Sequence, residues 1–211
     1  LGSMIGIDTI SDRASKIGFG KKTGIDLPGE KQGIMPNRVW LEKHYGRNWT
    51  KGHMLNLSIG QGDVLVSPIQ LACAYTIFAN EGRVPIPHIV RKNDTTYYAT
   101  DLSLEVIATI KAALTGVVAR GTGTMARVLD TEVCGKTGTS QNPHGEDHSL
   151  FVAFAPAMDP KILVCLVVEN AGHGGSVAAP IAGRIIKYFL STTKSDTSTI
   201  RADTENAAQK N

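Results

Sequence analysis

The chain has 211 residues, of which 42% are hydrophobic, and a formal net charge of +3. This length suits one globular domain with a sizeable core, or a large piece of a bigger one. The small charge and the lack of long basic runs give no argument for a nucleic-acid partner, and we expect none. Apolar runs are too short to cross a membrane, so we expect any membrane anchor to lie outside this sequence. We interpret the cysteines as buried hydrophobic residues without a disulfide framework: Cys73, Cys134 and Cys165.

Apolar periodicity predicts helices in the first part of the chain. One helix is expected over residues 8–17, and residues 31–54 are expected to form a polar loop whose aromatic side chains cover an edge of the core. Ser67 and Pro68 are a natural N-cap and first helical residue, so the next helix should run from there to about residue 80. A further helix is predicted over residues 102–118, after an extended segment that contains two prolines.

The last third of the chain predicts strands followed by one helix. Two short apolar segments, residues 149–155 and 162–168, flank a turn-like Met-Asp-Pro-Lys sequence and should form an antiparallel hairpin. A final helix is expected over residues 178–190, and the polar residues 191–211 resemble a flexible tail. This order predicts an α/β domain in which the last helix packs across the sheet.

The central feature is Lys136, which lies in a Gly-Lys-Thr-Gly-Thr run just before the predicted hairpin. A phosphate-binding loop would need glycine at position 130, but the residue there is Asp130, which would repel phosphate. A strand edge fits better, because a strand with a glycine can pair closely with an extended peptide. Lys136 supplies positive charge, and the hydroxyl groups of Thr137 and Thr139 can donate to a carboxylate. This pattern favours a peptide that ends in a free carboxylate.

Three other polar or glycine-rich stretches lie elsewhere in the chain. His144 and His148 have the spacing of helical zinc ligands, but Pro143 and Gly145 oppose a helix, so we predict a polar loop beside the substrate groove and no metal site. The glycine-rich residues 170–175 are expected to be a flexible connection. Gly60-Gln61-Gly62 is interpreted mainly as a tight turn before the helix at Ser67.

Several segments along the chain form an ordered set of landmarks: GFGKKTGIDLPGE at 18–30, SIGQG at 58–62 with SPIQLA at 67–72, GKTGTSQ at 135–141, AFAP at 153–156 and VEN at 168–170. Together, over roughly residues 5–190, they resemble the class B penicillin-binding proteins, most closely their elongation-type members. The Lys-Thr-Gly triplet is a signature of penicillin-binding proteins and serine β-lactamases.

The resemblance implies a penicillin-binding protein/serine β-lactamase-like fold, with an antiparallel sheet and flanking helices. It also implies peptidoglycan D,D-transpeptidation through a serine acyl-enzyme, with D-Ala-D-Ala stem peptides as substrates, β-lactams as inhibitors and no cofactor. By motif, Lys136, Thr137, Gly138 and Thr139 would bind the substrate carboxylate, with Lys136 and Thr139 catalytic. The Thr139 backbone N–H would be one oxyanion donor.

The family's Ser-x-x-Lys and Ser-x-Asn motifs should precede residue 18, and this chain has neither motif there. Ser191–Lys194 and Ser140–Asn142 match these motifs in letters only, at the wrong places. We therefore expect the C-terminal part of a transpeptidase domain over residues 5–190, an incomplete fold that is inactive alone. Residues 1–4 resemble a vector-derived junction.

For the intact protein, the resemblance implies a membrane-spanning glycosyltransferase partner and an anchor in the inner membrane. The catalytic domain would lie in the periplasm. An alternative is a non-catalytic module whose Lys136 strand holds peptide termini or a partner strand. A nucleotide-binding enzyme is a more distant alternative.

Overall fold

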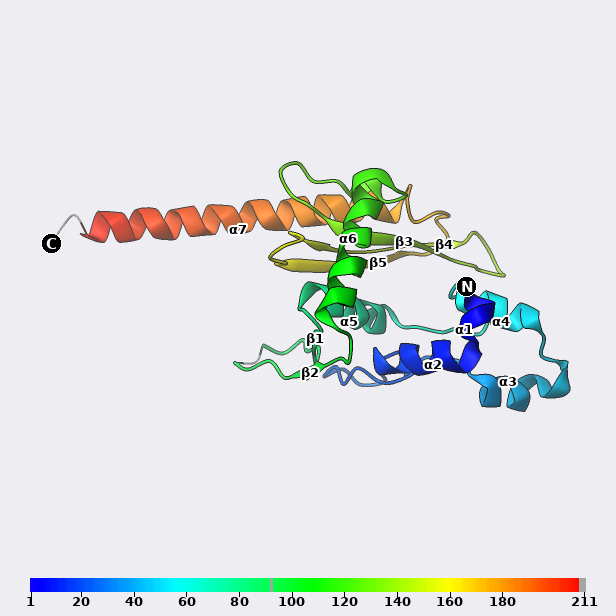
Figure 1. The fold of residues 1–211 in the computed structure, drawn as a ribbon. Helices are drawn as coiled ribbons and strands as arrows, with labels where there is room; N and C mark the ends of the chain where they lie inside the picture. Colours follow the sequence, from blue (N-terminus) through cyan, green and yellow to red (C-terminus); the bar gives the residue numbers. More distant parts are fainter. Residues whose placement is uncertain (92, 209–211) are drawn as a thin grey trace.

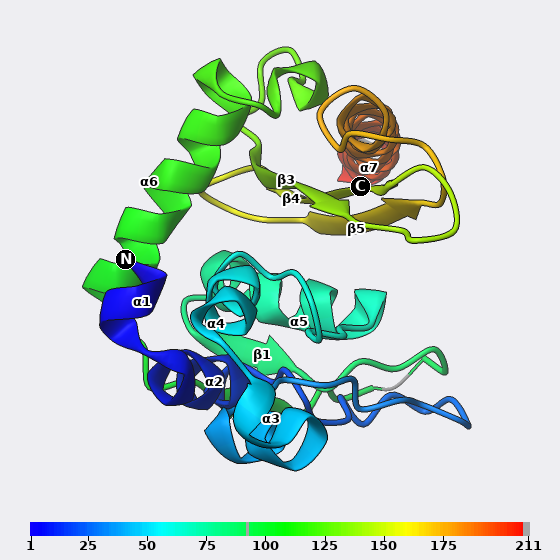
Figure 2. The same cartoon turned by 90° about the vertical axis from the view of Figure 1, so that its right-hand side faces the viewer.

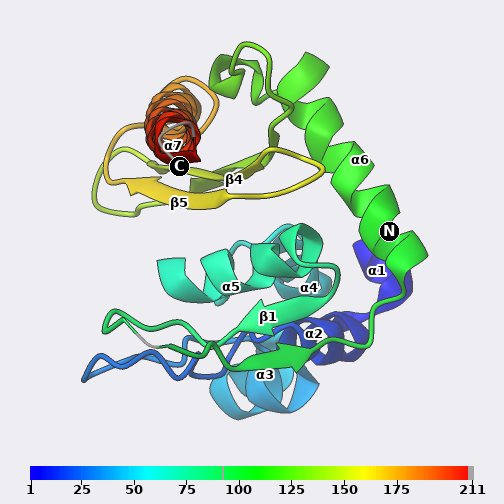
Figure 3. The same ribbon diagram turned by 90° about the vertical axis from the view of Figure 1, so that its left-hand side faces the viewer.

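The computed structural model describes residues 1–91 and 93–208, with the backbone alone described for residues 194–208. A three-stranded sheet lies between two helical layers (Figures 1 and 2). Helix α7 (Ala178–Ala208) covers one face, and α5 (Pro68–Ala79) covers the other. Helix α6 (Leu104–Arg120) runs along the side of the sheet and contacts β3 (Figure 3).

The sheet is antiparallel, in the order β3 (Cys134–Ser140), β4 (His148–Ala155) and β5 (Ile162–Val168). The predicted hairpin is confirmed, and the Lys136 run forms β3 beside it, as predicted. Lys136 pairs with Val152, and the pairing continues without a bulge from Cys134 to Ser140. Among the strands that the structure describes, β3 and β5 each have one edge without a partner.

Strand β4 is buried on both faces, which explains its almost continuous apolar sequence. Phe151 and Ala153 pack into the cluster that contains α7, where Ala178, Ala179 and Ala182 are fully buried. These small α7 residues let the helix lie close to the sheet. On the other face Phe154 packs with residues of α5 and α6.

The predicted helices are present with small changes in their limits. Helix α2 (Ile7–Lys16) matches the prediction for residues 8–17, and α5 begins as predicted, since Ser67 is its N-cap. The Ser67 hydroxyl accepts a hydrogen bond from the Gln70 N–H at 3.2 Å, and the Gln70 side-chain oxygen accepts one from the Ser67 N–H at 2.8 Å. This reciprocal capping box fixes the first turn of α5.

The prediction of a loop over residues 31–54 was wrong. The segment contains α3 (Arg38–Tyr45), the short 3-10 helix η1 (Gly46–Asn48) and the start of α4 (Lys51–Ser58). Both α-helices begin at capping residues that the analysis of periodicity overlooked, because the side chains of Asn37 and Thr50 accept from backbone N–H groups of the first turn. As predicted, Trp40 and Trp49 cover an edge of the core, in a cluster with Leu41 and Leu57.

The remaining elements are short. The extended, proline-containing segment predicted before residue 102 includes the antiparallel ribbon of β1 (Arg83–Pro85) and β2 (Tyr97–Ala99). A one-turn helix, α1 (Gly2–Ile5), contacts α4, and a 3-10 turn, η2 (Thr124–Ala126), follows α6 and contacts α7. That residues 1–4 are vector-derived stays a prediction.

Helix α7 extends past its predicted end at Leu190. It continues to Ala208 and projects beyond the sheet in Figure 1. The expected flexible tail is therefore helical up to that residue, and residues 209–211 lie outside the described residues. Residues 191–208 contain neither glycine nor proline, so nothing in this polar sequence interrupts the helix. Within the described ranges, no helix is both long and apolar enough to span a membrane.

The three cysteines are free thiols, as predicted. Cys73 and Cys134 are buried and Cys165 is half-buried. Burial raises the pKa of the Cys73 and Cys165 thiols to about 11, and it also raises that of Cys134. These residues therefore act as small hydrophobic groups of the core.

Candidate active site

Strand β3 places its side chains alternately on the two faces of the sheet. Cys134 packs on the α5 side with Phe154, so Lys136 and Gly138 belong to that face. Thr137 belongs to the opposite face, where its hydroxyl lies 2.9 Å from that of Thr122. A ligand that contacts the Lys136 ammonium and the threonine hydroxyls together must therefore lie at the open edge of β3, where the two faces meet.

The position of Gly174 shows which backbone groups reach that edge. A Cβ atom added to Gly174 would lie 2.4 Å from the Gly138 carbonyl oxygen and 2.3 Å from that of Leu150. Both oxygens hence lie between β3 and β4, as in a hydrogen-bonded antiparallel pair. Because the pattern alternates, the N–H and C=O groups of Thr137 and Thr139 point away from β4. These are the groups to which an extended peptide would pair.

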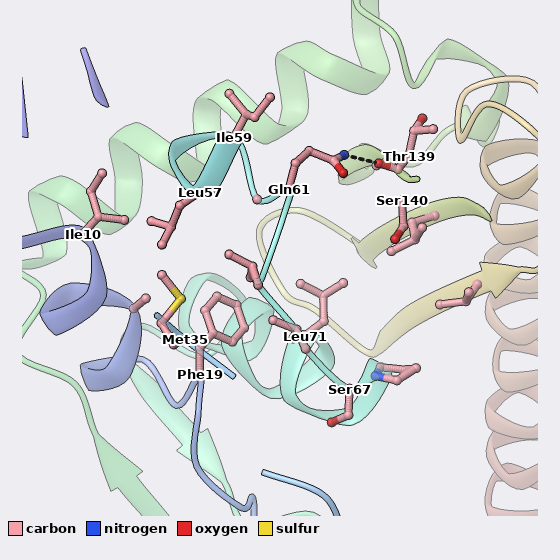
Figure 4. A pocket seen from close by; sticks show the side chains of 18 residues that line it. Ile10, Phe19, Met35, Leu57, Ile59, Gln61, Ser67, Leu71, Thr139 and Ser140 are labelled. Atoms are coloured by element: carbon pink, nitrogen blue, oxygen red, sulfur yellow. Dashed lines mark hydrogen bonds between the residues drawn. The ribbon is translucent and has the colours of Figure 1, made fainter. Parts of the chain in front are cut away.

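Both outward carbonyl groups already have a donor within the chain. The Lys136 Nζ donates to the Thr137 oxygen at 2.8 Å, which brings the ammonium around to the open edge. The Gln61 side-chain nitrogen donates to the Thr139 oxygen at 2.9 Å (Figure 4). The site therefore combines a cation, two outward N–H groups and the hydroxyl groups of Thr137 and Thr139.

Beside this edge lies a largely apolar cavity of about 430 Å³. It is bounded by α2, α4, α5 and the α5 face of the sheet, and Figure 4 shows the side chains that point into it. Its polar groups are few and lie toward β3 and the start of α5. The lining includes Ile10, Phe19, Met35, Leu57, Leu71, Gln61, Ser67, Gly138, Thr139 and Ser140.

The sequence landmarks meet around this cavity, and buried Gln70 joins two of them. Its side-chain nitrogen donates to the carbonyl oxygens of Lys21 at 2.6 Å and Gln32 at 2.8 Å. This side chain is only 2% exposed. Gln70 therefore fastens residues 18–34 to the first turn of α5. The capping-box pattern predicts only the contact with Ser67, so the role of Gln70 between landmarks was missed.

Residues 18–30 are held in shape by two carboxylates. Glu30 accepts from the Thr23 hydroxyl at 2.6 Å and from the Thr23 N–H at 2.7 Å. Burial acts to raise the pKa of Glu30, but the hydrogen bonds from Thr23 and Gly24 and the charge of Lys22 outweigh it, so this pKa lies below its ordinary value. Asp26 accepts from the backbone N–H groups of residues 89 and 90. Residues 18–30 therefore pack beside the site, and Asp26 connects them to the segment between β1 and β2.

The histidine-containing loop between β3 and β4 is polar, as predicted, and it joins the loop after β5. Asn142 donates to the Asn170 side-chain oxygen at 2.6 Å, and the Asn170 N–H donates to the His148 ring at 3.0 Å. His144 lies in a turn rather than a helix. Within the part of the chain that the structure describes, no group of three or more His, Cys, Asp and Glu side chains is placed to hold a metal ion.

The two motif-like serines lie apart from each other. Ser191 lies on α7, the helix that packs on the face of the sheet opposite the cavity, and its hydroxyl donates to the Tyr188 carbonyl at 2.8 Å. The side chain of Lys194 lies outside the described residues. Ser140 ends β3 and lines the cavity, but it belongs to the same strand as Lys136. Ser140 is thus on the Lys136 strand itself, and Ser191 is on a helix that does not line the cavity, so neither serine is placed as the nucleophile for this site.

The comparisons with known proteins agree with this geometry. Residues 1–187 match the family model described as the penicillin-binding protein transpeptidase domain. The chain belongs to this family. Among curated members, the peptidoglycan D,D-transpeptidase MrdA of Acinetobacter baumannii is 36% identical over 92% of the chain, which covers 33% of the relative. The MrdA protein of Haemophilus influenzae is 35% identical over 88% of the chain and 33% of the relative.

Solved structures of penicillin-binding transpeptidases share the fold. A penicillin-binding protein 2 (PBP2) from Helicobacter pylori aligns with a TM-score of 0.81 and 28% identity, over 90% of this chain and 36% of that chain. PBP2 from Pseudomonas aeruginosa, solved with WCK 5153, aligns with a TM-score of 0.78 and 33% identity, over 90% of this chain and 43% of that one. The predicted family and fold class are therefore confirmed, and so is the predicted similarity of this chain to penicillin-binding proteins of the PBP2 type.

The chain spans about a third of the length of the curated relatives it matches. This share agrees with the prediction that the sequence is part of a larger transpeptidase. The roles of Lys136, Thr137, Gly138 and Thr139 stay predictions. Gln61 is the residue of this site that sequence reasoning missed, because glycines on both sides indicated only a tight turn.

Proposed function

We propose that this chain forms the substrate-binding wall of a peptidoglycan D,D-transpeptidase. The observation that carries the proposal is the open edge of β3, which brings together the Lys136 ammonium and the outward N–H groups of Thr137 and Thr139 and reaches the cavity at Thr139. A D-Ala-D-Ala terminus is extended and ends in a carboxylate, so it can pair along the edge while its charge meets Lys136. β-Lactams, which resemble that terminus, would bind in the same place.

The catalytic roles follow from this pose. The Thr139 N–H donates to the oxyanion that forms when a serine Oγ attacks the penultimate D-Ala carbonyl carbon. The C–N bond to the last D-Ala then breaks, and that D-Ala leaves as a free amine, its nitrogen taking up the proton that the serine hydroxyl lost. The amine of a second stem peptide attacks the resulting ester, the C–O bond to the serine breaks, and the proton lost by the attacking amine restores the serine hydroxyl. Lys136, Thr137, Gly138 and Thr139 bind the carboxylate until the last D-Ala leaves with it.

The serine is proposed to lie in an upstream Ser-x-x-Lys segment that this sequence does not contain. The apolar cavity beside Thr139 is a suitable place for such a segment, because an upstream helix could bury the side chains that line it. On this proposal residues 5–190 are the C-terminal part of the transpeptidase domain, and the isolated chain binds but does not acylate.

The wider setting of the intact protein is proposed from its relatives. One solved neighbour is PBP2 of H. pylori in complex with MreC, so we propose protein partners of the same class, together with a membrane-spanning glycosyltransferase. The intact protein would be anchored in the inner membrane through a segment outside this sequence, with its catalytic domain in the periplasm.

A labelling experiment tests the proposal. The chain is mixed with a fluorescent penicillin, denatured and examined by intact mass, beside a longer protein that contains this sequence and an upstream Ser-x-x-Lys motif. We expect label on the longer protein alone. Label on the isolated chain, with Ser191 the first residue to map, would overturn the assignment of the nucleophile.

A binding experiment tests the β3 edge. A diacetylated peptide ending in D-Ala-D-Ala is titrated against the chain, with the same peptide as a C-terminal amide for comparison. Lys136→Ala should lower affinity for the free acid by roughly tenfold and leave the amide nearly unchanged, because only the acid carries the charge that Lys136 meets. Equal affinities for acid and amide in the wild-type chain would contradict the proposed carboxylate site.

A further inference from the structure

The Gln61 side chain closes part of the edge to which the proposed substrate would pair. Gln61 lies between α4 and α5, and its backbone N–H is fixed by a hydrogen bond to the Asn56 oxygen at 2.9 Å. Only the side chain crosses to β3, where it donates to the Thr139 oxygen at 2.9 Å (Figure 4). One hydrogen bond therefore connects this loop to the edge of the site.

The Gln61 carboxamide is chemically a stand-in for one peptide unit. It is planar, and its N–H group donates to an outward carbonyl of an edge strand, as the N–H of an added strand would do. Lys136 covers the other outward carbonyl, that of Thr137, in the same way. In this conformation the edge is covered by the chain's own side chains, which also protects it from unwanted strand addition.

The surroundings of Gln61 leave room for its side chain to move. The flanking Gly60 and Gly62 have φ values of 76° and 72°, and a Cβ on Gly60 would meet no atom within 4 Å. A second, more polar hollow of about 500 Å³ lies beside Gln61 and is lined partly by Asn142 and Asp147. A released carboxamide can therefore be hydrated there, at little cost.

We propose that Gln61 is a displaceable cap on the Thr139 carbonyl, a specificity-determining residue that an extended peptide must replace with its own backbone N–H. The inference rests on the proposed function, because it assumes that the peptide pairs with β3. It selects ligands that offer an N–H at this position, since a ligand without one would leave the carbonyl unpaired after Gln61 moves away.

The test follows the Gln61 side-chain NH₂ signals by NMR while the wild-type chain is titrated with the diacetylated D-Ala-D-Ala peptide. At saturation we expect these signals to move to the values of an exposed glutamine, for which Gln32 is the internal reference. The backbone amide signals of Thr137 and Thr139 report peptide binding separately. If they shift while the Gln61 signals stay in place, the cap is not displaced and the inference fails alone.

Variants of Gln61 give a second measurement, the affinity for the peptide. Affinity should rise if Gln61 is a cap that the peptide displaces and fall if Gln61 supports the bound state. Gln61→Ala and Gln61→Met lack the donor, so the peptide no longer competes with it and should bind roughly threefold to tenfold more tightly. The methionine variant keeps the length of the side chain and guards against a packing effect. Gln32→Ala should leave affinity unchanged.

Weaker binding by both Gln61 variants would show that Gln61 supports the bound state, and it would overturn the cap. If no β3 amide shifts with the peptide at saturating concentration, the proposed function fails for this chain, and the inference fails with it. The two failures are thus distinguished by the β3 signals.

Discussion

Replacing Gln70 by alanine should detach residues 18–34 from α5. The Gln70 side chain is 2% exposed and makes hydrogen bonds to three backbone groups. Its oxygen accepts from the Ser67 N–H at 2.8 Å, and its nitrogen donates to the carbonyl groups of Lys21 and Gln32 at 2.6 and 2.8 Å. Alanine can make none of these bonds.

The expected loss of stability follows from these three bonds. Each contributes about 0.5–1.5 kcal/mol net, so their removal should lower the free energy of unfolding by about 3 kcal/mol, with part of the cost arising from carbonyl groups left without a donor. This value already includes the loss of the capping box, because the bond from the Ser67 N–H to the Gln70 side chain is one of the three. Gln70→Glu should be at least as harmful, because its carboxylate would face the Lys21 and Gln32 carbonyl oxygens.

Equilibrium unfolding in urea, followed by tryptophan fluorescence, measures the effect. The matched control is Gln141→Ala, whose exposed side chain should change stability by less than about 0.5 kcal/mol. Relative to the wild-type chain, amide hydrogen exchange in Gln70→Ala should accelerate most in residues 18–34 and less in the rest of the chain. A Gln70→Ala variant as stable as the Gln141→Ala control would refute the reasoning.

The remaining predictions concern a close backbone contact, a carboxylate and a thiol. Gly174→Ala should lower the free energy of unfolding by more than about 3 kcal/mol, because the new Cβ would overlap two carbonyl oxygens of the β3–β4 pair. Gly172→Ala, at φ +73° in open space, should cost only about 1 kcal/mol. Equal shifts of the melting temperature in the two variants would contradict this difference. Glu30 has a folded-state pKa below its unfolded value, so its contribution is complete above the unfolded pKa and is lost as pH falls through the folded pKa. Glu30→Gln should therefore be less stable than wild type at neutral pH and converge with it in acid, and a constant difference in melting temperature across this range would argue against the shift. Cys165, with a pKa of about 11, should react slowly with iodoacetamide in the folded chain and rapidly in denaturant, as mass spectrometry of the alkylated chain would show; rapid labelling of folded chain would mean that the thiol is not held in the core.

Local signals predicted the elements that have strong periodicity or a clear cap. The hairpin of β4 and β5 follows from two apolar segments around a turn, and the start of α5 follows from Ser67 and Pro68. The loop predicted over residues 31–54 failed, because α3 and α4 are short and lack a strong apolar stripe, so only Asn37 and Thr50 mark their starts. The predicted end of α7 was wrong for a different reason. The polar composition of residues 191–208 was interpreted as a tail, although this stretch contains no helix-breaking residue.

The amino-acid sequence by itself determined the position of Lys136 on a strand and the order of the landmarks, because both depend on neighbouring residues. Tertiary structure alone decided which groups of β3 face outward and what covers them. Gln61 reaches Thr139 from 78 residues away, and Gln70 reaches Lys21 from 49. Hydrogen bonds between such distant residues depend on how the layers pack, since no local propensity or period encodes them.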